Sequence, residues 1–390
     1  MVYNKLYLLF RNIIANFDKI EKIKKGETMP EKMQVFHGSD LEKIEEIYGI
    51  KKEDIIPFGG NVNPLGISPL FRESLIRHVD AVCTYPDRSY RTLRSALSQY
   101  ARIPMEHIIV GNGVTELISL TMHLLRPKKA LLLSPTYSEY MREISMIGGT
   151  CLEYHLQESS DFRLDIEDLK RSLTSDVDLF AFCNPNNPTS SALNPDEISE
   201  ILSHCKKHGI FVLADETYVE FAPDMDAVTA VPLTRKFDNL FVLRGTSKFF
   251  AAPGIRLGYG ISGNMDFIRA VEDKKNPWSI NTLAALAGEA MFMDTDYINK
   301  TKAYIAEERR KCTEKLSDAP SFKIYPSYAN FLLVRLTDGT TSHEMFERCI
   351  KKGLMIRDCS SFEGLDGEYI RFCFRKAEEN NALLDTLLHK

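Results

Sequence analysis

Residues 179–215 read LFAFCNPNNPTSSALNPDEISEILSHCKKHGIFVLAD and decide the fold. The stretch begins with the apolar run Leu179–Phe182 and ends with Phe211–Ala214, and short continuous apolar runs are typical of buried parallel strands. Between them Asn194 is a good helix N-cap, because a proline follows it and a glutamate three residues later completes a capping box; Gly209 ends the helix. Strand, helix and strand in succession predict a mostly parallel sheet with helices on both faces.

The same alternation extends outward along the chain from about Glu106. Three further runs are predicted to be buried strands: Ile108–Val110, Ala130–Leu133 and Leu240–Leu243. After Pro277 the pattern changes to a long helical stretch that ends near Leu316, followed by isolated strands around Phe331–Leu336 and Tyr369–Phe374. This change predicts a second, smaller α+β domain. We divide the chain into an N-terminal extension (1–28), an arm that contributes to the small domain (29–80), a large domain (81–276) and a small C-terminal domain (277–390).

The composition excludes several classes of protein. Of the 390 residues, 44% are hydrophobic and 26% charged, which fits neither a disordered nor a fibrous protein. The net charge of −5 offers no field that would attract a nucleic acid, and no apolar run is long enough to span a membrane. The eight cysteines include no C-x-x-C pair. We therefore expect reduced thiols and a cytoplasmic protein.

Residues 1–28 are interpreted as an amphipathic extension, because apolar residues recur at helical spacing with lysines on the other face. No secretory cleavage site follows the short apolar run near the start. The alternatives are packing on the rest of the chain, disorder, attachment to a membrane surface, or translation that starts at Met29 or Met33.

Residues suited to chemistry follow the predicted strands, where the ligands of parallel sheets bind. Gly111 and Gly113 open a helix, and backbone amides there can hold a phosphate. Asp215 ends an apolar strand, where a carboxylate needs a cationic partner. Lys248 lies among phenylalanines and alanines, which lower the pKa of an amine and make it a nucleophile toward carbonyls. Each has an ordinary interpretation as a turn, a helix cap or a surface lysine, but together they are the parts needed to hold pyridoxal phosphate.

A set of motifs connects these residues. The motifs are Y-P-D (85–87), G-N-G (111–113), N-P-N-N-P-T (184–189), D-E-x-Y (215–218) and S-K…R (247, 248 and 256). With them the chain resembles the fold-type I pyridoxal-phosphate enzymes of the histidinol-phosphate aminotransferase group, from about His37 to Leu384. The resemblance implies pyridoxal 5'-phosphate as cofactor, a large cofactor-binding domain with a mostly parallel sheet, and a smaller α+β C-terminal domain.

The resemblance also implies roles for individual residues. Lys248 would bind the aldehyde of the cofactor, and Asp215 would pair with the protonated ring nitrogen. Tyr218, the third catalytic residue, and Asn187 would hydrogen-bond the ring hydroxyl. The remaining cofactor contacts are Tyr137 on the ring face and, around the phosphate, Gly113, Val114, Ser247 and Arg256. Tyr85 matches a tyrosine that reaches the cofactor phosphate of the neighbouring subunit, which implies a homodimer with shared sites.

Within this group the chain most resembles the L-threonine-O-3-phosphate decarboxylases of cobalamin biosynthesis. The segments that carry this resemblance are His37-Gly38, Asn61–Gly66, Pro277–Gly288 and Ile356–Arg371. It implies that the chain decarboxylates a small phosphorylated L-amino acid, either threonine phosphate, which would give 1-aminopropan-2-yl phosphate, or serine phosphate. The substrate's carboxylate and phosphate would be bound by His37, Gly38, Asn61, Asn187, Arg357 and Arg371.

Three residues depart from the family pattern. Gly245 replaces a hydroxyl residue three before the lysine, so that one phosphate contact is lost or moves to Thr246. Ser190 replaces the glycine that usually ends N-P-T-G. Tyr218 is typical of the aminotransferases, whereas the decarboxylase pattern can carry phenylalanine there.

Other interpretations stay open at this point. The chain could be an aminotransferase of histidinol phosphate or another amino acid with 2-oxoglutarate, because the two reactions differ only in which bond to Cα breaks. A non-catalytic ligand sensor is disfavoured by the intact Lys248 and Asp215. Tyr137 and Trp278 could be core aromatics, and the two arginines could form surface ion pairs. His204 and His208 share a helix face without a third ligand, so no metal site is expected.

Overall fold

The computed structural model describes residue 36, residue 38 and residues 40–389. The predictions for residues 1–28 and for His37 lie outside these residues.

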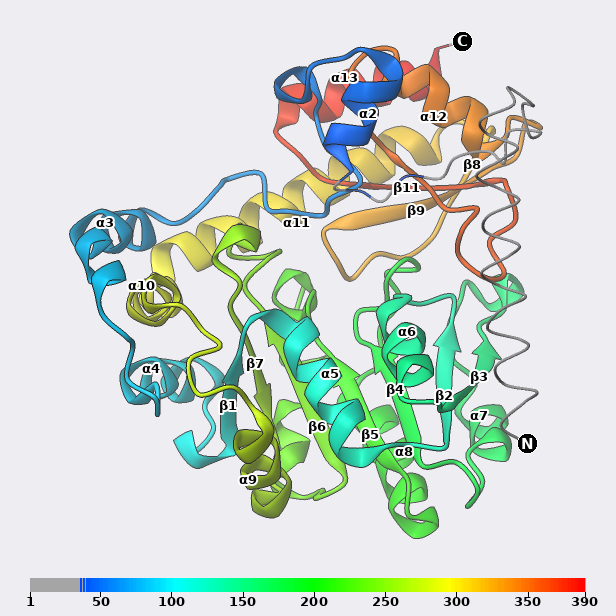
Figure 1. The fold of residues 1–390 in the computed structure, drawn as a ribbon. Coiled ribbons are helices and arrows are strands. Elements are labelled where there is room, and N and C mark those ends of the chain that lie inside the picture. The colour runs from blue at the N-terminus through cyan, green and yellow to red at the C-terminus, as the bar shows by residue number, and fades with distance from the viewer. Residues whose placement is uncertain (1–35, 37, 39, 390) are drawn as a thin grey trace, which may run out of the picture. The chain divides into compact units, whose positions relative to one another are not determined.

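Seven strands of the described chain form a larger sheet in the order β1-β7-β6-β5-β4-β2-β3 (Figure 1). The strands are β1 (Ile108–Gly111), β2 (Lys129–Ser134), β3 (Thr150–His155), β4 (Leu179–Cys183), β5 (Phe211–Asp215), β6 (Leu240–Gly245) and β7 (Gly258–Ile261). Neighbouring strands pair in parallel except at β7, which is antiparallel to both β1 and β6. The predicted mostly parallel sheet, with all five predicted strands, is confirmed.

Helices cover both faces of this sheet. The helices before and between its strands are α2 (Leu41–Tyr48), α3 (Pro69–Arg77), α4 (Arg91–Ala101), α5 (Gly113–Leu125), α6 (Glu139–Met146), α7 (Ile166–Ser172) and α8 (Pro195–His208), and α9 (Met265–Lys274) follows β7. On one face α5, α6 and α9 bury Leu117, Tyr140 and Val271 against Leu213 of β5 (Figure 1). Helices α7 and α8 contact each other, and right-handed crossovers in this strand order put them on the opposite face. None of the helices that the structure describes combines the length and apolarity needed to cross a membrane.

A smaller antiparallel sheet has the order β10-β11-β9-β8. Its strands are β8 (Phe322–Ile324), β9 (Phe331–Leu336), β10 (Arg357–Asp358) and β11 (Tyr369–Cys373), and the helices of this part of the sequence are α11 (Thr295–Ser317), α12 (Ser342–Ile350) and α13 (Ala377–Leu388). The helix before them, α10 (Thr282–Met293), packs instead on α3 and α4 (Figure 1). Helix α12 packs on β10 and β11 and also contacts α13. The larger sheet falls within residues 81–276 and the smaller within 277–390, but the domain boundaries themselves stay predictions.

The sequence missed elements whose stability depends on their neighbours. Strand β3 forms an edge of the larger sheet and is only half-buried, so it has no apolar run. Strand β7 reads Gly-Tyr-Gly-Ile, and Gly258 is required there because a Cβ would lie 2.6 Å from the backbone nitrogen of Val114. Strands β8 and β10 are too short to give a pattern. The predicted single helix before Leu316 is two helices, since Asp294 caps α11 and ends α10.

A buried ion pair joins the ends of β5 and β6. Glu216 follows β5, and its carboxylate accepts hydrogen bonds from Arg244 Nε at 3.0 Å and Nη2 at 2.8 Å. The two side chains are 0% and 2% exposed. Thr229 Oγ1 donates to the same carboxylate and accepts from Arg244, so it holds both side chains of the ion pair in place. The ends of β5 and β6 are thereby held together on the face opposite Leu213 and Leu243.

We expect Glu216→Gln to lower the free energy of unfolding by about 3 kcal/mol, because Arg244 would stay buried without its counter-charge. The measurement is urea unfolding of the cofactor-free protein. Glu307→Gln is the matched control: Glu307 pairs with Arg310 in the solvent, and its loss should cost less than about 1 kcal/mol. Equal costs for the two variants would contradict a structural role of the buried pair.

Candidate active site

Asp215 ends β5 with its carboxylate buried. The carboxylate accepts hydrogen bonds from Tyr140 Oη at 2.7 Å, from Thr217 N at 2.9 Å and from Thr217 Oγ1 at 2.5 Å. Burial raises the pKa of Asp215, and these hydrogen bonds oppose the rise. Among the described residues it pairs with no cationic side chain. A buried carboxylate in this state favours a ligand that presents a protonated ring nitrogen.

Lys248 follows β6 by three residues and is half-buried. Its Nζ donates to the carbonyl oxygen of Gly60 at 2.7 Å. Burial, and after it the charge of Arg371, lowers the pKa of Lys248 to about 8. About a tenth of this amine is therefore neutral at pH 7, far more than of an ordinary lysine, and the neutral form is the one that attacks an aldehyde.

Asn61 and Tyr218 meet across the site. The Nδ2 of Asn61 donates to Tyr218 Oη at 3.2 Å, and both side chains are buried. Asn61 has a φ of 56°, and its Oδ1 has no hydrogen-bond partner among the described residues. An acceptor that is buried and unpaired is costly, so we expect a ligand or water to donate to it. Burial raises the pKa of Tyr218 and keeps its hydroxyl protonated.

Arg357 and Arg371 are direct cross-strand partners in β10 and β11. Arg371 is buried, donates through Nη1 to Asn187 Oδ1 and through Nη2 to Gly59 O at 2.8 Å, and lies 5.2 Å above the Phe331 ring. Arg357 Nη2 donates to Ser361 Oγ at 2.6 Å. Burial, and then the Arg371 charge, lowers the pKa of Arg357. Two guanidinium groups on neighbouring positions repel each other, and this pairing therefore favours an anionic ligand.

The first turn of α5 forms a cradle. Gly113 begins the helix with a φ of 75°, and a Cβ there would lie 2.5 Å from Arg256 Nη2. Across it, Gly258 allows β7 to approach the Val114 amide. Helix N-termini with a nearby arginine bind phosphate well. Ser247 is half-buried in the loop that leads to Lys248.

The loss of a hydroxyl at Gly245 is not compensated by Thr246. The Thr246 hydroxyl is buried and donates to the Leu257 carbonyl oxygen at 2.9 Å, so it is not free for a phosphate. A Cβ on Gly245 would lie 3.0 Å from the Val114 side chain, so little room is left for the missing hydroxyl residue. The Thr246 contact therefore does not favour the second of the two outcomes given above, and the loss of one phosphate contact stays a prediction.

The aromatic residues differ in their surroundings. Tyr137 is half-buried with its ring 5.6 Å from that of Tyr140. Burial, followed by the charges of Glu139 and Asp215, raises the pKa of Tyr137 to about 12. Tyr85 is 79% exposed and stacks on Trp278, which is itself 43% exposed, so Trp278 is not a core residue. Within this chain Tyr85 is not part of the site.

Gly38 packs against the backbone that carries the Lys248 and Arg371 contacts. A Cβ on Gly38 would lie 2.0 Å from the carbonyl oxygen of Gly59. The next residue, Gly60, accepts the hydrogen bond from Lys248. Of the residues implied as substrate contacts, the structure thus brings Gly38, Asn61, Asn187, Arg357 and Arg371 together. Sequence reasoning missed Tyr140, whose only signal was its position one helical turn after Tyr137, and Thr217, a residue in an Asp-x-Thr turn.

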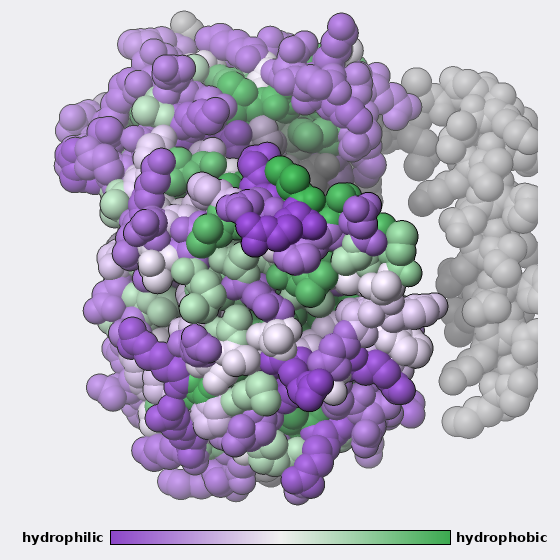
Figure 2. Space-filling view, turned by 90° about the vertical axis from the view of Figure 1, so that its left-hand side faces the viewer, coloured by the Kyte–Doolittle hydropathy of each residue, from purple (hydrophilic) through white to green (hydrophobic). Residues whose placement is uncertain are grey.

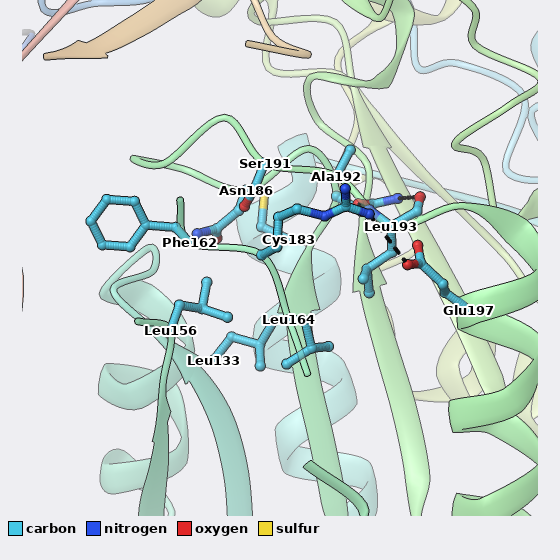
Figure 3. Close-up of a pocket in the computed structure, with 12 residues that line it drawn as sticks. Leu133, Leu156, Phe162, Leu164, Cys183, Asn186, Ser191, Ala192, Leu193 and Glu197 are labelled. Atoms are coloured by element: carbon cyan, nitrogen blue, oxygen red, sulfur yellow. Dashed lines mark hydrogen bonds and ion pairs between the residues drawn. The ribbon is translucent and has the colours of Figure 1, made fainter. Parts of the chain in front are cut away.

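The pocket in Figure 3 is separate from this site. It lies beside the 184–191 loop, against Leu133, Phe162 and Asn186, and includes neither Lys248 nor Asp215. Its free volume of about 20 Å³ is room for about one water molecule.

Comparison with known proteins decides the family. Residues 53–387 match the model of the family "Aminotransferase class I and II". The chain belongs to this family. A protein of Caldanaerobacter subterraneus subsp. tengcongensis, provisionally named a threonine-phosphate decarboxylase, is 37% identical over 84% of this chain and 88% of its own. The histidinol-phosphate aminotransferase of Methanococcus aeolicus is 31% identical over 90% of this chain and 94% of its own. The crystal structure of the histidinol-phosphate aminotransferase from Clostridium acetobutylicum superposes with a TM-score of 0.80, with 30% identity over 85% of this chain and 97% of that one.

Pyridoxal 5'-phosphate is the cofactor of this family member. The site fits it: Asp215 is a buried carboxylate with no cationic partner in the described part of the chain, Lys248 is a half-buried amine with a lowered pKa, and Gly113 keeps the cradle beside Arg256 open. The similarity to the histidinol-phosphate aminotransferase group and the fold-type I architecture are thereby confirmed.

The lowered pKa of Lys248 predicts how cofactor-free protein takes up pyridoxal phosphate. Only the neutral amine reacts, so the rate should rise about tenfold per pH unit below the pKa of about 8 and level off above it. The measurement is the visible absorbance of the bound cofactor after mixing, with Lys248→Ala as the unreactive control. A rate that keeps rising toward the ordinary lysine pKa of about 10.4 would show that burial does not act on this amine.

Proposed function

We propose that this chain decarboxylates a small phosphorylated L-amino acid, with L-threonine-O-3-phosphate as the first candidate and L-serine phosphate as the second. The cross-strand pair of Arg357 and Arg371 carries the proposal, because it offers two arginine forks to a substrate with two anionic ends. The relative named a threonine-phosphate decarboxylase supports it. The product, 1-aminopropan-2-yl phosphate, would serve cobalamin side-chain synthesis, as the resemblance implies.

The two arginines are proposed to bind different ends of the substrate. Arg371 donates a hydrogen bond to Asn187, one of the proposed cofactor contacts, and the Arg371 charge lowers the pKa of Lys248. Arg371 therefore lies near the end of the substrate at which the reaction takes place. We assign the substrate carboxylate to it. Arg357 is oriented by Ser361 and stacks 5.2 Å from Phe362, and we assign the phosphate to it.

When bound, pyridoxal phosphate supplies an aldehyde for the substrate amine and a protonated ring that accepts the electron pair left by the departing carbon dioxide. Asp215 would keep the ring nitrogen protonated, since its burial makes a charge-assisted hydrogen bond there strong. Asn187 and Tyr218 would orient the ring hydroxyl. Lys248 Nζ is the proposed donor of the proton that replaces the carboxylate on Cα. Gly113, Val114, Ser247 and Arg256 would hold the cofactor phosphate.

An aminotransferase of histidinol phosphate or another amino acid is the second candidate. Tyr218, which is typical of that branch, and the Methanococcus aeolicus relative favour it. Both candidates need the same cofactor and the same arginines. They differ in which substrate bond to Cα is turned perpendicular to the ring.

The test is incubation of the purified, cofactor-loaded protein with L-threonine phosphate in the absence of any oxo acid. We expect carbon dioxide, and much less from unphosphorylated threonine. Glutamate that appears only when 2-oxoglutarate is added would instead identify a transaminase. Equal turnover of threonine and threonine phosphate would show that the site does not bind the substrate phosphate, and would contradict the role proposed for Arg357.

Variants make the same test sharper. Arg357→Met should lower kcat/KM for threonine phosphate about 100-fold and change that for threonine far less. Arg335→Met is the matched control, because Arg335 lies on β9 of the same sheet and pairs with Glu368.

We further propose a homodimer with shared sites. Exposed apolar side chains gather where α3, the following turn and α10 meet: Leu70, Ile76, Val79, Val82, Tyr85, Trp278 and Met293. Figure 2 views the molecule from the side of α3 and α10, and hydrophobic side chains show there between polar borders. An exposed apolar surface of this kind is typical of a protein interface. It includes Tyr85, which by the resemblance would contact the cofactor phosphate of the neighbouring subunit.

Sedimentation at micromolar concentration should therefore give about twice the chain mass of 44.5 kDa. Val82→Asp should produce monomers, because a charge buried in the interface opposes association. These monomers should retain the cofactor poorly, because each cofactor site would lack the Tyr85 side chain of the neighbouring subunit. Met146→Asp changes an equally exposed apolar residue on α6 and should leave the dimer intact. A monomer with full activity would refute the shared site.

A further inference from the structure

Ser190 has a conformation that a serine adopts only at a cost. It is fully buried and has a φ of 60°, in the left-handed region that favours glycine. Glycine is also the residue that the family pattern carries here. A hydroxyl at such a position calls for an explanation in the contacts that it makes.

The hydroxyl binds the segment that leads into the smaller sheet. Ser190 Oγ accepts hydrogen bonds from Ala329 N at 2.9 Å and Tyr328 N at 3.1 Å, and it lies 3.1 Å from Ser327 Oγ. The Ser190 carbonyl also accepts from Tyr328 N, at 3.0 Å. Glycine could supply only this last bond, and the Ala329 amide would lose its acceptor.

The loop on the other side of this contact is itself fixed. Asn186 N donates to Ser191 O and Asn186 O accepts from Ser190 N, both at 2.8 Å. Asn186 Nδ2 also donates to Pro135 O at 2.9 Å. Figure 3 shows the Asn186 and Ser191 side chains at this loop. The loop that carries Asn187 is therefore a rigid base for Ser190.

The segment that Ser190 holds leads directly to substrate-site residues. Asn330, which follows Ala329, donates to the carbonyl oxygen of Asn61 at 3.0 Å, and Phe331 lies beneath Arg371. Arg371 in turn donates to Asn187 on the base loop. The contacts of Ser190 with Ala329, of Phe331 with Arg371 and of Arg371 with Asn187 thus close a ring between the loop of the larger sheet and β9 and β11 of the smaller sheet.

We propose that Ser190 is a positioning residue that pins residues 327–331 to the Asn187 loop and thereby sets where Arg371 holds the substrate carboxylate relative to Lys248. This inference rests on the proposed function for the identity of the substrate, but not for the contact itself. The Ser190 hydroxyl adds two hydrogen bonds to residues 328 and 329 that a glycine could not make, and so fixes the distance between β9 and the Asn187 loop.

The test compares Ser190→Gly and Ser190→Ala with Ser191→Ala. Ser191 belongs to the same loop, but its hydroxyl bonds Thr189 and does not contact residues 327–331. The first readout is hydrogen exchange of the Ala329 amide in the cofactor-loaded protein without substrate. We expect this amide to exchange about tenfold faster in both Ser190 variants and unchanged in Ser191→Ala, since only the former remove its acceptor.

The second readout is steady-state kinetics with L-threonine phosphate. KM should rise about fivefold to tenfold in the Ser190 variants with a smaller change in kcat, and cofactor absorbance should stay as in the parent protein. Ser190→Gly relieves the left-handed strain, so it keeps the test valid if Ser190→Ala does not fold. Unchanged Ala329 exchange, or faster exchange with an unchanged KM, would overturn the proposal. Absence of any turnover of threonine phosphate by the parent protein would instead refute only the proposed function, because the exchange readout needs no substrate.

Discussion

One buried guanidinium joins the two strand ends that carry Asp215 and Lys248. Arg244 lies four residues before Lys248, and its partner Glu216 lies one residue after Asp215. Because the pair is on the opposite face of the sheet from the Asp215 carboxylate, it holds both strand ends without occupying the site. Glu220 lies close by and is fully buried, and burial raises its pKa to about 7. Near neutral pH this carboxyl is therefore only partly ionised, which limits the negative charge beside the pair.

The sequence predicted those parts of the fold and site that are encoded locally. Strands such as Phe211–Asp215 and the capping box of α8 follow from residues within a few positions of one another, and the structure has both. The position of Lys248 and Asp215 at strand ends followed from the topology of parallel sheets. By contrast, β7 exists because its glycines fit between α5 and β6, and Asn61 reaches Tyr218 across more than 150 residues. Contacts of this kind leave no periodic signal in the sequence.

The arginine pair illustrates the limit of such reasoning for the substrate. Arg357 and Arg371 were expected to bind two anions, and the register of β10 and β11 makes them neighbours. Two neighbouring guanidinium groups favour a ligand with two anionic groups. Threonine phosphate carries a carboxylate and a phosphate, and 2-oxoglutarate, the co-substrate of an aminotransferase, carries two carboxylates, so the pair fits both candidate reactions. Which bond of a bound amino acid breaks depends on a rotation about one bond, and the two kinds of relative differ there while sharing the fold.

The cradle at Gly113 and Gly258 is made of backbone, whereas the anion-binding groups of β10 and β11 are side chains. Any side chain at Gly113 would collide with Arg256, and any at Gly258 with the Val114 amide, so the geometry of the cradle tolerates no substitution at these two positions. A substitution of Arg357 or Arg371 would instead change charge and hydrogen bonding on β10 and β11 and leave the first turn of α5 in place. The two regions thus differ in how far a single substitution can alter them.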